Sequence, residues 1–211
     1  MKGDWSKTRS VNRFYQKVVL VLTISVMGVF LPGLANSQWK PDEGSELIGS
    51  RAPELHNLRW LNCKPLTLAS LRGKVVLIRF WLIDCSFCQR TAPALNYLLD
   101  KYQNNGLVII GIHHPKSKEA ENQDLVSKGA KELKFKFPVA MDNDWTNVNA
   151  FWLSKKKRAY TSASFLIDKR GKIRWIHPGG DIIKDENSSG SGSETAFTSL
   201  ENEIKTLLVE K

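Results

Sequence analysis

The spacing of apolar residues divides most of the chain into strands and helices. Strands that are apolar on both faces show no alternation, and they are typical of a sheet that is covered on two sides. Residues 75–81 and 107–112 are runs of this kind, and further strands are predicted over residues 137–141, 164–167 and 172–176. Residues 168–171, which end in Gly171, predict a hairpin turn between the last two strands, because glycine adopts positive φ freely.

Helical spacing of apolar residues fills the intervals between these strands. It begins after Cys85, recurs over residues 122–133, and gives residues 194–209 the pattern of an amphipathic helix. The polar triplet 142–144 can cap a short helix that ends near Trp152. Alternating strands and helices, followed by a hairpin and a last helix, predict a central mixed sheet with helices on both faces.

The segment before the first long strand predicts a small extension of this sheet. Residues 56–61 and 65–68 are short strand candidates, and Asn62, Cys63 and Lys64 separate them. This pattern predicts an N-terminal hairpin with Cys63 at its exposed turn. Residues 36–52 are polar and are typical of a linker, so we expect one folded domain over residues 53–211.

Residues 1–35 have the pattern of a targeting segment. Five basic residues precede the apolar run 18–31, and small residues follow it at 33–35. This arrangement predicts a secretory signal peptide, with an uncleaved membrane anchor as the alternative. Either one places the domain outside the cytoplasm, where disulfides persist. The formal net charge of the 211 residues is +10, but no nucleic-acid motif accompanies it.

A Cys-x-x-Cys pair stands where the strand 75–81 meets the following helix. Cys85 is expected at the first helical turn, where unpaired N–H groups favour a thiolate and lower a thiol pKa from about 8.5 to roughly 3.5–7.5. Cys88 follows nearly one turn later on the same side, so it can close a disulfide with Cys85. We therefore predict that Cys85 attacks a partner's disulfide and that Cys88 resolves the mixed disulfide.

Zinc binding and an inert structural role compete with redox chemistry for the cysteine pair. A structural zinc site needs four protein ligands, and the remaining candidates are Cys63, His113 and His114, with no second Cys-x-x-Cys. Two buried cysteines could also be chemically inert, but the strand-to-helix context favours a redox pair. We expect neither a metal nor a bound cofactor.

Several motifs together resemble the thioredoxin-fold proteins of the TlpA and DipZ-like type. They are Leu-Arg-Gly-Lys-Val-Val-Leu at 71–77, Phe-Trp at 80–81, the cysteine pair, Pro93, Val-Ile-Ile-Gly-Ile-His at 108–113 and Phe-Leu-Ile-Asp-Lys-Arg-Gly at 165–171. The resemblance covers about residues 50–180 and implies a thioredoxin-like three-layer α/β/α sandwich, here with the N-terminal hairpin added. It also implies a thiol–disulfide oxidoreductase with Cys85 as the attacking thiol.

The chain departs from this family at three positions near the cysteines. Ser162 takes the place of a cis-proline that faces the cysteine pair; a non-proline cis bond costs about 2.5–4 kcal/mol, so we expect a trans bond and an altered substrate-docking loop. Arg79 stands where many thioredoxins have an acid, and its side chain either points beneath the cysteines, favouring a thiolate, or extends to the surface. Asp84, beside Cys85, would oppose the effect of the helix end.

Substrate contacts are assigned to Trp81, as a wall of the active site or else a core residue, and to Ser162. Of His113 and His114, one is expected to be a structural hydrogen-bond partner and not a proton carrier. The predicted function is reduction or exchange of disulfides in extracytoplasmic proteins. The expected partners are protein thiols or disulfides and an upstream thiol reductant, for which a membrane electron carrier is one candidate.

The alternative function is a thioredoxin-fold binding or assembly module with lost or altered redox turnover, suggested by Ser162 and Asp84. A thiol peroxidase is a poor match, because the chain lacks a Pro-x-x-x-Thr-x-x-Cys arrangement. The domain is expected in the periplasm or anchored to a membrane from outside the cytoplasm.

Overall fold

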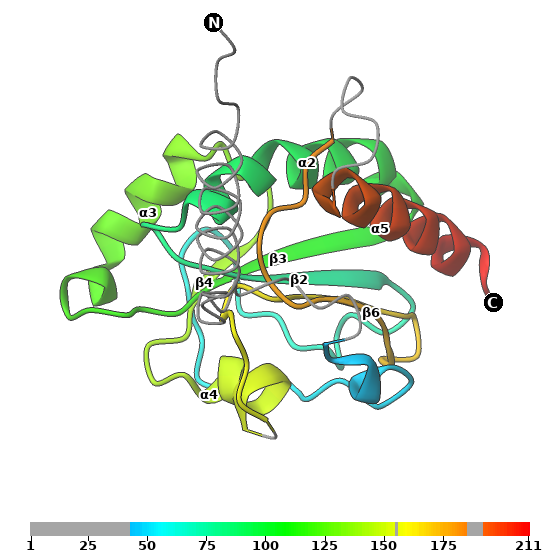
Figure 1. Ribbon diagram of the computed structural model, residues 1–211, viewed down its shortest axis with the longest axis horizontal. Coiled ribbons are helices and arrows are strands. Elements are labelled where there is room, and N and C mark those ends of the chain that lie inside the picture. The colour runs from blue at the N-terminus through cyan, green and yellow to red at the C-terminus, as the bar shows by residue number, and fades with distance from the viewer. Residues whose placement is uncertain (1–42, 155, 185–191) are drawn as a thin grey trace, which may run out of the picture. The chain divides into compact units, whose positions relative to one another are not determined.

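A six-stranded mixed sheet forms the centre of the domain in the computed structural model, which describes residues 43–154, 156–184 and 192–211 (Figure 1). The strands are β1 (Arg59–Trp60), β2 (Val75–Trp81), β3 (Leu107–His113), β4 (Val139–Met141), β5 (Ser164–Ile167) and β6 (Ile173–His177). Their order in the sheet is β1-β4-β3-β2-β5-β6. The predicted long strands are therefore confirmed, with ends that differ by one or two residues.

Strand β2 lies at the middle of the sheet and is buried along its whole length. It pairs in parallel with β3, from Val75 opposite Leu107 to Trp81 opposite His113. On its other side it pairs antiparallel with β5. A strand with paired neighbours on both edges and cover on both faces favours apolar residues, which explains the apolar run that only Arg79 interrupts.

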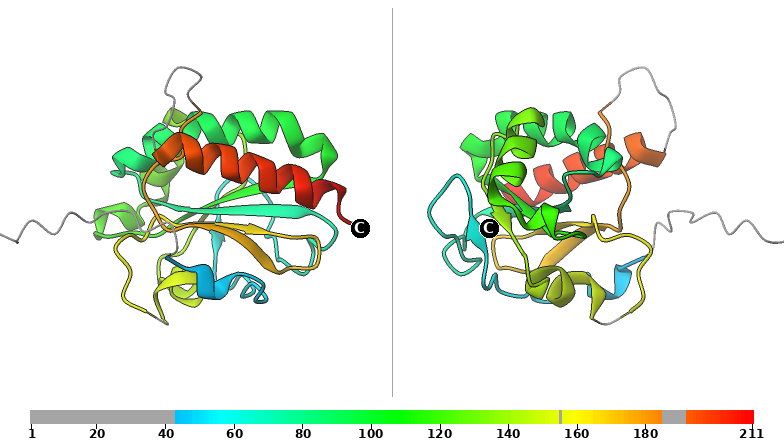
Figure 2. Two further views of the ribbon diagram at one scale, coloured as in Figure 1. Left: turned by 45° about the vertical axis from the view of Figure 1, so that its right-hand side comes forward. Right: turned by 90° about the vertical axis from the view of Figure 1, so that its left-hand side faces the viewer.

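Helices cover both faces of the sheet. Figure 2 shows the long helices over one face and short helical segments against the other. The long helices are α2 (Ser86–Tyr102), α3 (Gln123–Glu132) and α5 (Gly192–Val209), and the short segments are η1 (Ser45–Leu47), α4 (Thr146–Val148) and η4 (Asn149–Leu153). This arrangement confirms the expected three-layer α/β/α sandwich with a mixed sheet.

Side chains of β2 alternate between two hydrophobic cores, one on each face of the sheet. Leu77 and Trp81 join the core that includes residues of α2 and α5. Ile78 and Phe80 join the other core, beside α4 and η4. Because side chains two residues apart in a strand share a face, Arg79 belongs to the α2 side. The strand thus directs one arginine toward the helix that carries the cysteines.

The predicted N-terminal hairpin is wrong. Residues Arg59–Trp60 form β1, but they pair antiparallel with β4, from Arg59 opposite Met141. Residues 65–68 form no strand. Instead, the Glu54 carboxylate accepts hydrogen bonds from the backbone N–H groups of Leu68 and Ala69, at 2.5 and 2.9 Å. This long-range contact turns the segment away from the extended form that its apolar residues favour.

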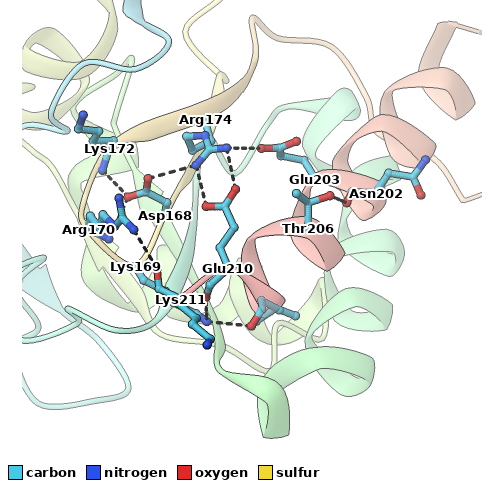
Figure 3. A network of polar contacts seen from close by, with 11 residues as sticks. Asp168, Lys169, Arg170, Lys172, Arg174, Asn202, Glu203, Thr206, Glu210 and Lys211 are labelled. Atoms are coloured by element: carbon cyan, nitrogen blue, oxygen red, sulfur yellow. Dashed lines mark hydrogen bonds and ion pairs between the residues drawn. The ribbon is translucent and has the colours of Figure 1, made fainter.

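The turn between β5 and β6 and the end of α5 are joined by an ion-pair network (Figure 3). Arg174 on β6 forms two hydrogen bonds with the Glu210 carboxylate, at 2.9 and 3.0 Å. Asp168 accepts from the backbone N–H groups of Arg170 and Lys172 and so closes the turn. Gly171 has the positive φ, 80°, that the sequence predicts for this turn.

The predicted signal or anchor segment, residues 1–35, lies outside the described residues. Within residues 43–154, 156–184 and 192–211, the helices are too short or too polar to cross a membrane.

A buried carboxylate anchors the short helix α4 to the sheet. Asp142 is 0% exposed and accepts hydrogen bonds from the backbone N–H groups of Asn147 and Val148 and from the side-chain amide of Asn147. Its own N–H donates to the carbonyl of His113 at 2.7 Å. Asp142 therefore holds the start of α4 through its carboxylate and the end of β3 through its backbone N–H.

Replacing Asp142 by alanine is expected to destabilise the domain by about 2–5 kcal/mol, because each buried N–H group left without an acceptor costs about 1–3 kcal/mol. Urea unfolding followed by circular dichroism measures this loss. Asn143→Ala, at the exposed neighbouring position, is the control and should change stability by less than about 0.5 kcal/mol. Equal stability of the two variants would contradict the anchoring role.

Candidate active site

Cys85 and Cys88 form a disulfide at the start of helix α2. Cys85 is the N-cap residue, with extended backbone, and its sulfur accepts the backbone N–H of Cys88 at 3.1 Å. The two Cα atoms are 5.2 Å apart. This placement confirms the prediction that Cys85 stands at the helix start, where N–H groups and the helix dipole favour a negative sulfur after reduction.

The two sulfurs differ in their access to solvent. Cys85 is partly exposed, whereas Cys88 is 2% exposed and packs in the core on the α2 side of the sheet. A bulky partner can therefore reach Cys85 but not Cys88.

Arg79 lies beneath the cysteine pair, which is the first of its two predicted positions. Its side chain is 1% exposed, and Nη2 lies 3.8 Å from the Cys88 sulfur. Nη2 also donates to the carbonyl of Gly180 at 2.9 Å, and Nη1 donates to Ser164 Oγ at 3.1 Å. Burial lowers the pKa of Arg79 to about 10, against an opposing effect of the Asp181 charge, so the guanidinium is a cation at neutral pH.

Part of the glycine-rich segment after β6 holds Arg79 from the other side. Gly180 has φ of 86° and supplies the accepting carbonyl. Ile182 is 0% exposed, and its N–H donates to Thr91 Oγ1 on α2 at 3.0 Å. Asp181 binds Arg90 Nε at 2.6 Å. These contacts join segments that are far apart in the chain, and no local pattern in the sequence predicts them.

A cavity of about 350 Å³ opens beside Cys85. Its lining is mostly apolar and includes Leu82, Ile83, Phe87, Ala120 and Tyr160. Lys116, Asp84 and Thr161 add polar groups to the rim. A cavity of this kind suits an apolar side chain next to a reacting sulfur of a protein substrate.

Ser162 lies in the wall of this cavity and is 4% exposed. The described residues contain no cis peptide bond, so the Thr161–Ser162 bond is trans, as expected for serine at this position. Thr161 Oγ1 lies 2.8 Å from His114 Nε2, which ties the Ser162 loop to the end of β3. His114 is therefore a structural hydrogen-bond partner.

Trp81 lies behind the cavity wall and does not line it. Its side chain is 0% exposed, and its ring packs edge-on against His113 and Phe135, with centroids 5.2 and 5.1 Å away. A direct contact between Trp81 and a substrate stays a prediction that this geometry does not favour. The core role, which the sequence also allows, is what the structure shows.

Three histidines are buried near the site and stay neutral. Burial lowers the pKa of His113 to about 4 and that of His177 to about 3. Burial also lowers the pKa of His114 to about 3, helped by the charges of His113, Lys116 and Arg79. Neither ring nitrogen of His113 has a hydrogen-bond partner among the described residues. Of these neutral side chains, His114 and His177 both feel the charge of Arg79.

The third cysteine, Cys63, is exposed, as the sequence predicts, and is free in this structure; partial burial raises the pKa of its thiol. Within the described part of the chain, no three side chains of His, Cys, Asp or Glu gather as a metal site requires.

Comparison with known proteins shows which family this chain is similar to. The profile described as the AhpC/TSA family matches residues 48–176. Protein DipZ of Mycobacterium tuberculosis is 40% identical over 129 residues, which are 59% of this chain and 18% of DipZ. The chain thus spans about a fifth of the length of that relative.

Shorter relatives are covered almost completely. The thiol-disulfide oxidoreductase YkuV of Bacillus subtilis is 30% identical over 139 residues, which are 66% of this chain and 85% of YkuV. The thiol-disulfide oxidoreductase ResA of Bacillus cereus is 30% identical over 163 residues, which are 77% of this chain and 86% of ResA.

Among solved structures, a thioredoxin-like protein in its oxidised form matches with a TM-score of 0.54 and 28% identity, covering 82% of this chain and 97% of that protein. A thioredoxin-family thiol:disulfide interchange protein of Chlorobium tepidum matches with a TM-score of 0.57 and 19% identity, covering 75% and 95%, which shows the fold alone.

The buried neutral histidines predict acid-sensitive stability. Because their folded-state pKa values lie below the unfolded value of about 6.5, the unfolded chain binds protons that the folded domain does not. Stability is therefore complete above pH 6.5 and falls as the pH drops toward 4, by up to about 1.4 kcal/mol per pH unit for each histidine.

His113→Leu removes one of the three histidines that cause this loss of stability. Between pH 7 and pH 5 the free energy of unfolding should therefore fall less than in wild type, by about the contribution of one histidine, as measured by urea unfolding at each pH. The exposed His56 provides the control, His56→Gln, which should leave the slope unchanged. An identical slope in wild type and His113→Leu would refute the burial effect.

Proposed function

This chain belongs to the AhpC/TSA family, and we propose that it is a thiol–disulfide oxidoreductase with Cys85 as its attacking thiol and Cys88 as its resolving thiol. The observation that carries this assignment is the unequal access of the two sulfurs: Cys85 caps the helix beside an open cavity, and Cys88 is buried behind it.

Each catalytic cycle moves one electron pair through two exchange steps. The Cys85 thiolate attacks a substrate disulfide, so a bond forms between Cys85 and one substrate sulfur while the substrate S–S bond breaks and releases a thiolate. Cys88, as a thiolate, then attacks the Cys85 sulfur and releases the second substrate thiolate. The substrate gains two electrons, and the enzyme is left with the Cys85–Cys88 disulfide present in the structure.

A further cycle requires a reductant. A dithiol partner that attacks Cys85 expels Cys88 as a thiolate and, in a second exchange, takes the disulfide away. This partner is the upstream thiol reductant, and a membrane electron carrier is our candidate for it. The same two steps in reverse oxidise a substrate dithiol.

The substrates are proteins whose reacting disulfide lies beside apolar side chains. The cavity next to Cys85 supports this assignment, because its walls are mostly apolar and its volume suits one or two side chains. Ser162 in the cavity wall is proposed to contact the bound chain beside its sulfur. Trp81 would act from behind the wall by supporting its shape.

We place this reaction outside the cytoplasm. The basic residues followed by an apolar run in residues 1–35 support export, and an oxidising compartment supplies disulfides for the enzyme to act on. Cleavage would leave a periplasmic enzyme, whereas retention would leave a domain tethered to the membrane.

The assignment of the two thiols predicts opposite behaviour for two serine variants. Cys85→Ser should reduce dithiothreitol-dependent insulin reduction to the uncatalysed rate, because a serine hydroxyl supplies no nucleophile at neutral pH. Cys88→Ser should instead accumulate a mixed disulfide between Cys85 and its substrates, seen on non-reducing gels and released by dithiothreitol.

Cys63→Ser serves as the matched control and should retain turnover. Turnover in Cys85→Ser, or mixed disulfides that persist in the Cys85→Ser, Cys88→Ser double variant, would show that another sulfur carries the reaction.

Chemical labelling of the free, exposed Cys63 can show on which side of the cytoplasmic membrane the domain lies. In cells whose outer barrier is opened while the cytoplasmic membrane stays intact, a membrane-impermeant maleimide should label Cys63 in a Cys85→Ser, Cys88→Ser background. Labelling should disappear when Cys63 is also changed to serine. Labelling that appears only after full lysis would overturn the export proposal.

A further inference from the structure

Arg79 is a buried cation whose hydrogen-bond acceptors are all neutral. A guanidinium has five N–H donors. In the oxidised protein they meet the Gly180 carbonyl, the Ser164 hydroxyl and the Cys88 sulfur, and Nε donates to no described residue. Strand β2 supplies this side chain from within the core, and it is 1% exposed.

The structure offers Arg79 no direct carboxylate partner among the described residues. Asp181 is the acid whose charge acts on Arg79, but its carboxylate binds Arg90 Nε at 2.6 Å. Arg90 is exposed, so that pair faces solvent. A buried charge without a counter-ion is costly and is rarely retained without a use. The guanidinium is therefore an incomplete ion pair while Cys88 remains in the disulfide.

We propose that Arg79 is the counter-ion of the Cys88 thiolate and that it shifts the cysteine pair toward its reduced form. When the disulfide is reduced, two electrons convert the bonded sulfurs to thiols or thiolates, and the Cys88 sulfur remains beside Nη2. A negative sulfur completes the ion pair, whereas the disulfide sulfur is only a weak neutral acceptor. Arg79 therefore stabilises the reduced state more than the oxidised state and raises the reduction potential.

The contact between Arg79 and the Cys88 sulfur also affects the rate of both exchange steps. This part of the inference rests on the proposed role of Cys88 as the resolving thiol. When a reductant thiolate attacks Cys85, a new bond forms to the Cys85 sulfur, the Cys85–Cys88 bond breaks, and the electron pair stays on Cys88. A stabilised leaving thiolate departs faster. In the resolving step, Cys88 is already deprotonated and needs no general base.

The groups around Arg79 leave its charge intact across the working pH range. His114 at the end of β3 and His177 on β6 both feel the Arg79 charge, and both stay neutral well below pH 6. From helix α2, Cys88 contacts Arg79, and the charge of Asp181, which pairs with the exposed Arg90, acts on it from the segment after β6. The thiols are thus the groups expected to titrate beside Arg79 between pH 5 and pH 9.

The test compares the redox equilibrium of the full chain in wild type, Arg79→Met and Arg79→Lys. Each protein is equilibrated with mixtures of reduced and oxidised dithiothreitol or glutathione, and the Cys85–Cys88 pair is read out by alkylation and mass shift. Arg79→Met should move the equilibrium toward the disulfide at least tenfold, which corresponds to a potential about 30 mV more negative. Arg79→Lys, which keeps the charge, should recover most of the difference.

Arg174→Met is the matched control, because it removes an arginine from β6 at the network of Figure 3 without touching the cysteines. It should change the equilibrium less than twofold. An Arg79→Met protein that is folded by circular dichroism, with an equilibrium within twofold of wild type, would overturn the proposal.

A second measurement keeps the inference testable if Arg79→Met does not fold. In a Cys85→Ser, Cys63→Ser protein, thiolate absorbance near 240 nm reports Cys88 alone. Its midpoint should lie well below that of a cysteine in the unfolded chain, although burial by itself would move it upward. A midpoint at or above the unfolded value would refute the ion pair.

These readouts separate failure of this inference from failure of the proposed function. The redox equilibrium with a small dithiol depends on the two sulfurs and Arg79 and does not require a protein substrate. Turnover that survives in Cys85→Ser would remove the proposed function, whereas an unchanged equilibrium in Arg79→Met would remove only the tuning by Arg79.

Discussion

The junction between strand β2 and helix α2 is the constraint on which the site depends. Strand β2 is paired on both edges and buried on both faces. The chain can therefore leave it only at the end of the sheet, where it enters helix α2. That path puts Cys85 at the helix N-terminus and buries Cys88 one turn later. Strand periodicity then carries Arg79, two residues before the strand's end, to the face below Cys88.

Local patterns in the sequence were enough to predict this junction. Features that depend on long-range contacts could not be predicted. The apolar run, the cysteine spacing and the helical periodicity are each confined to neighbouring residues, so β2, the pair and α2 could be predicted. The hydrogen bond that holds the Arg79 guanidinium beneath Cys88 could not, because its acceptor is Gly180, about a hundred residues away. The predicted hairpin was wrong for the same reason. One of its two segments pairs with β4, and the other is bound by the Glu54 carboxylate.

Burial leaves the three histidines neutral but leaves the arginine charged. Removing His113, His114 and His177 from water disfavours their protonation, since their ordinary pKa lies close to neutrality. Arg79 begins so much higher that the same desolvation leaves it charged. Of these four buried side chains, Arg79 is therefore the one that is charged at neutral pH, and in the protein interior its interaction with a sulfur anion is stronger than in water.

A thermodynamic cycle connects that charge to the stability of the fold. Reduction and unfolding are linked, so any free energy by which Arg79 favours the reduced pair in the folded domain must also favour folding of the reduced chain over the oxidised chain. A tenfold effect on the redox equilibrium corresponds to about 1.4 kcal/mol on each side of the cycle. A structural disulfide works in the opposite sense, because it constrains the unfolded chain and stabilises the fold. In this domain the contact with Arg79 counteracts that gain, and the Cys85–Cys88 bond is suited to being broken and remade rather than to holding the fold together.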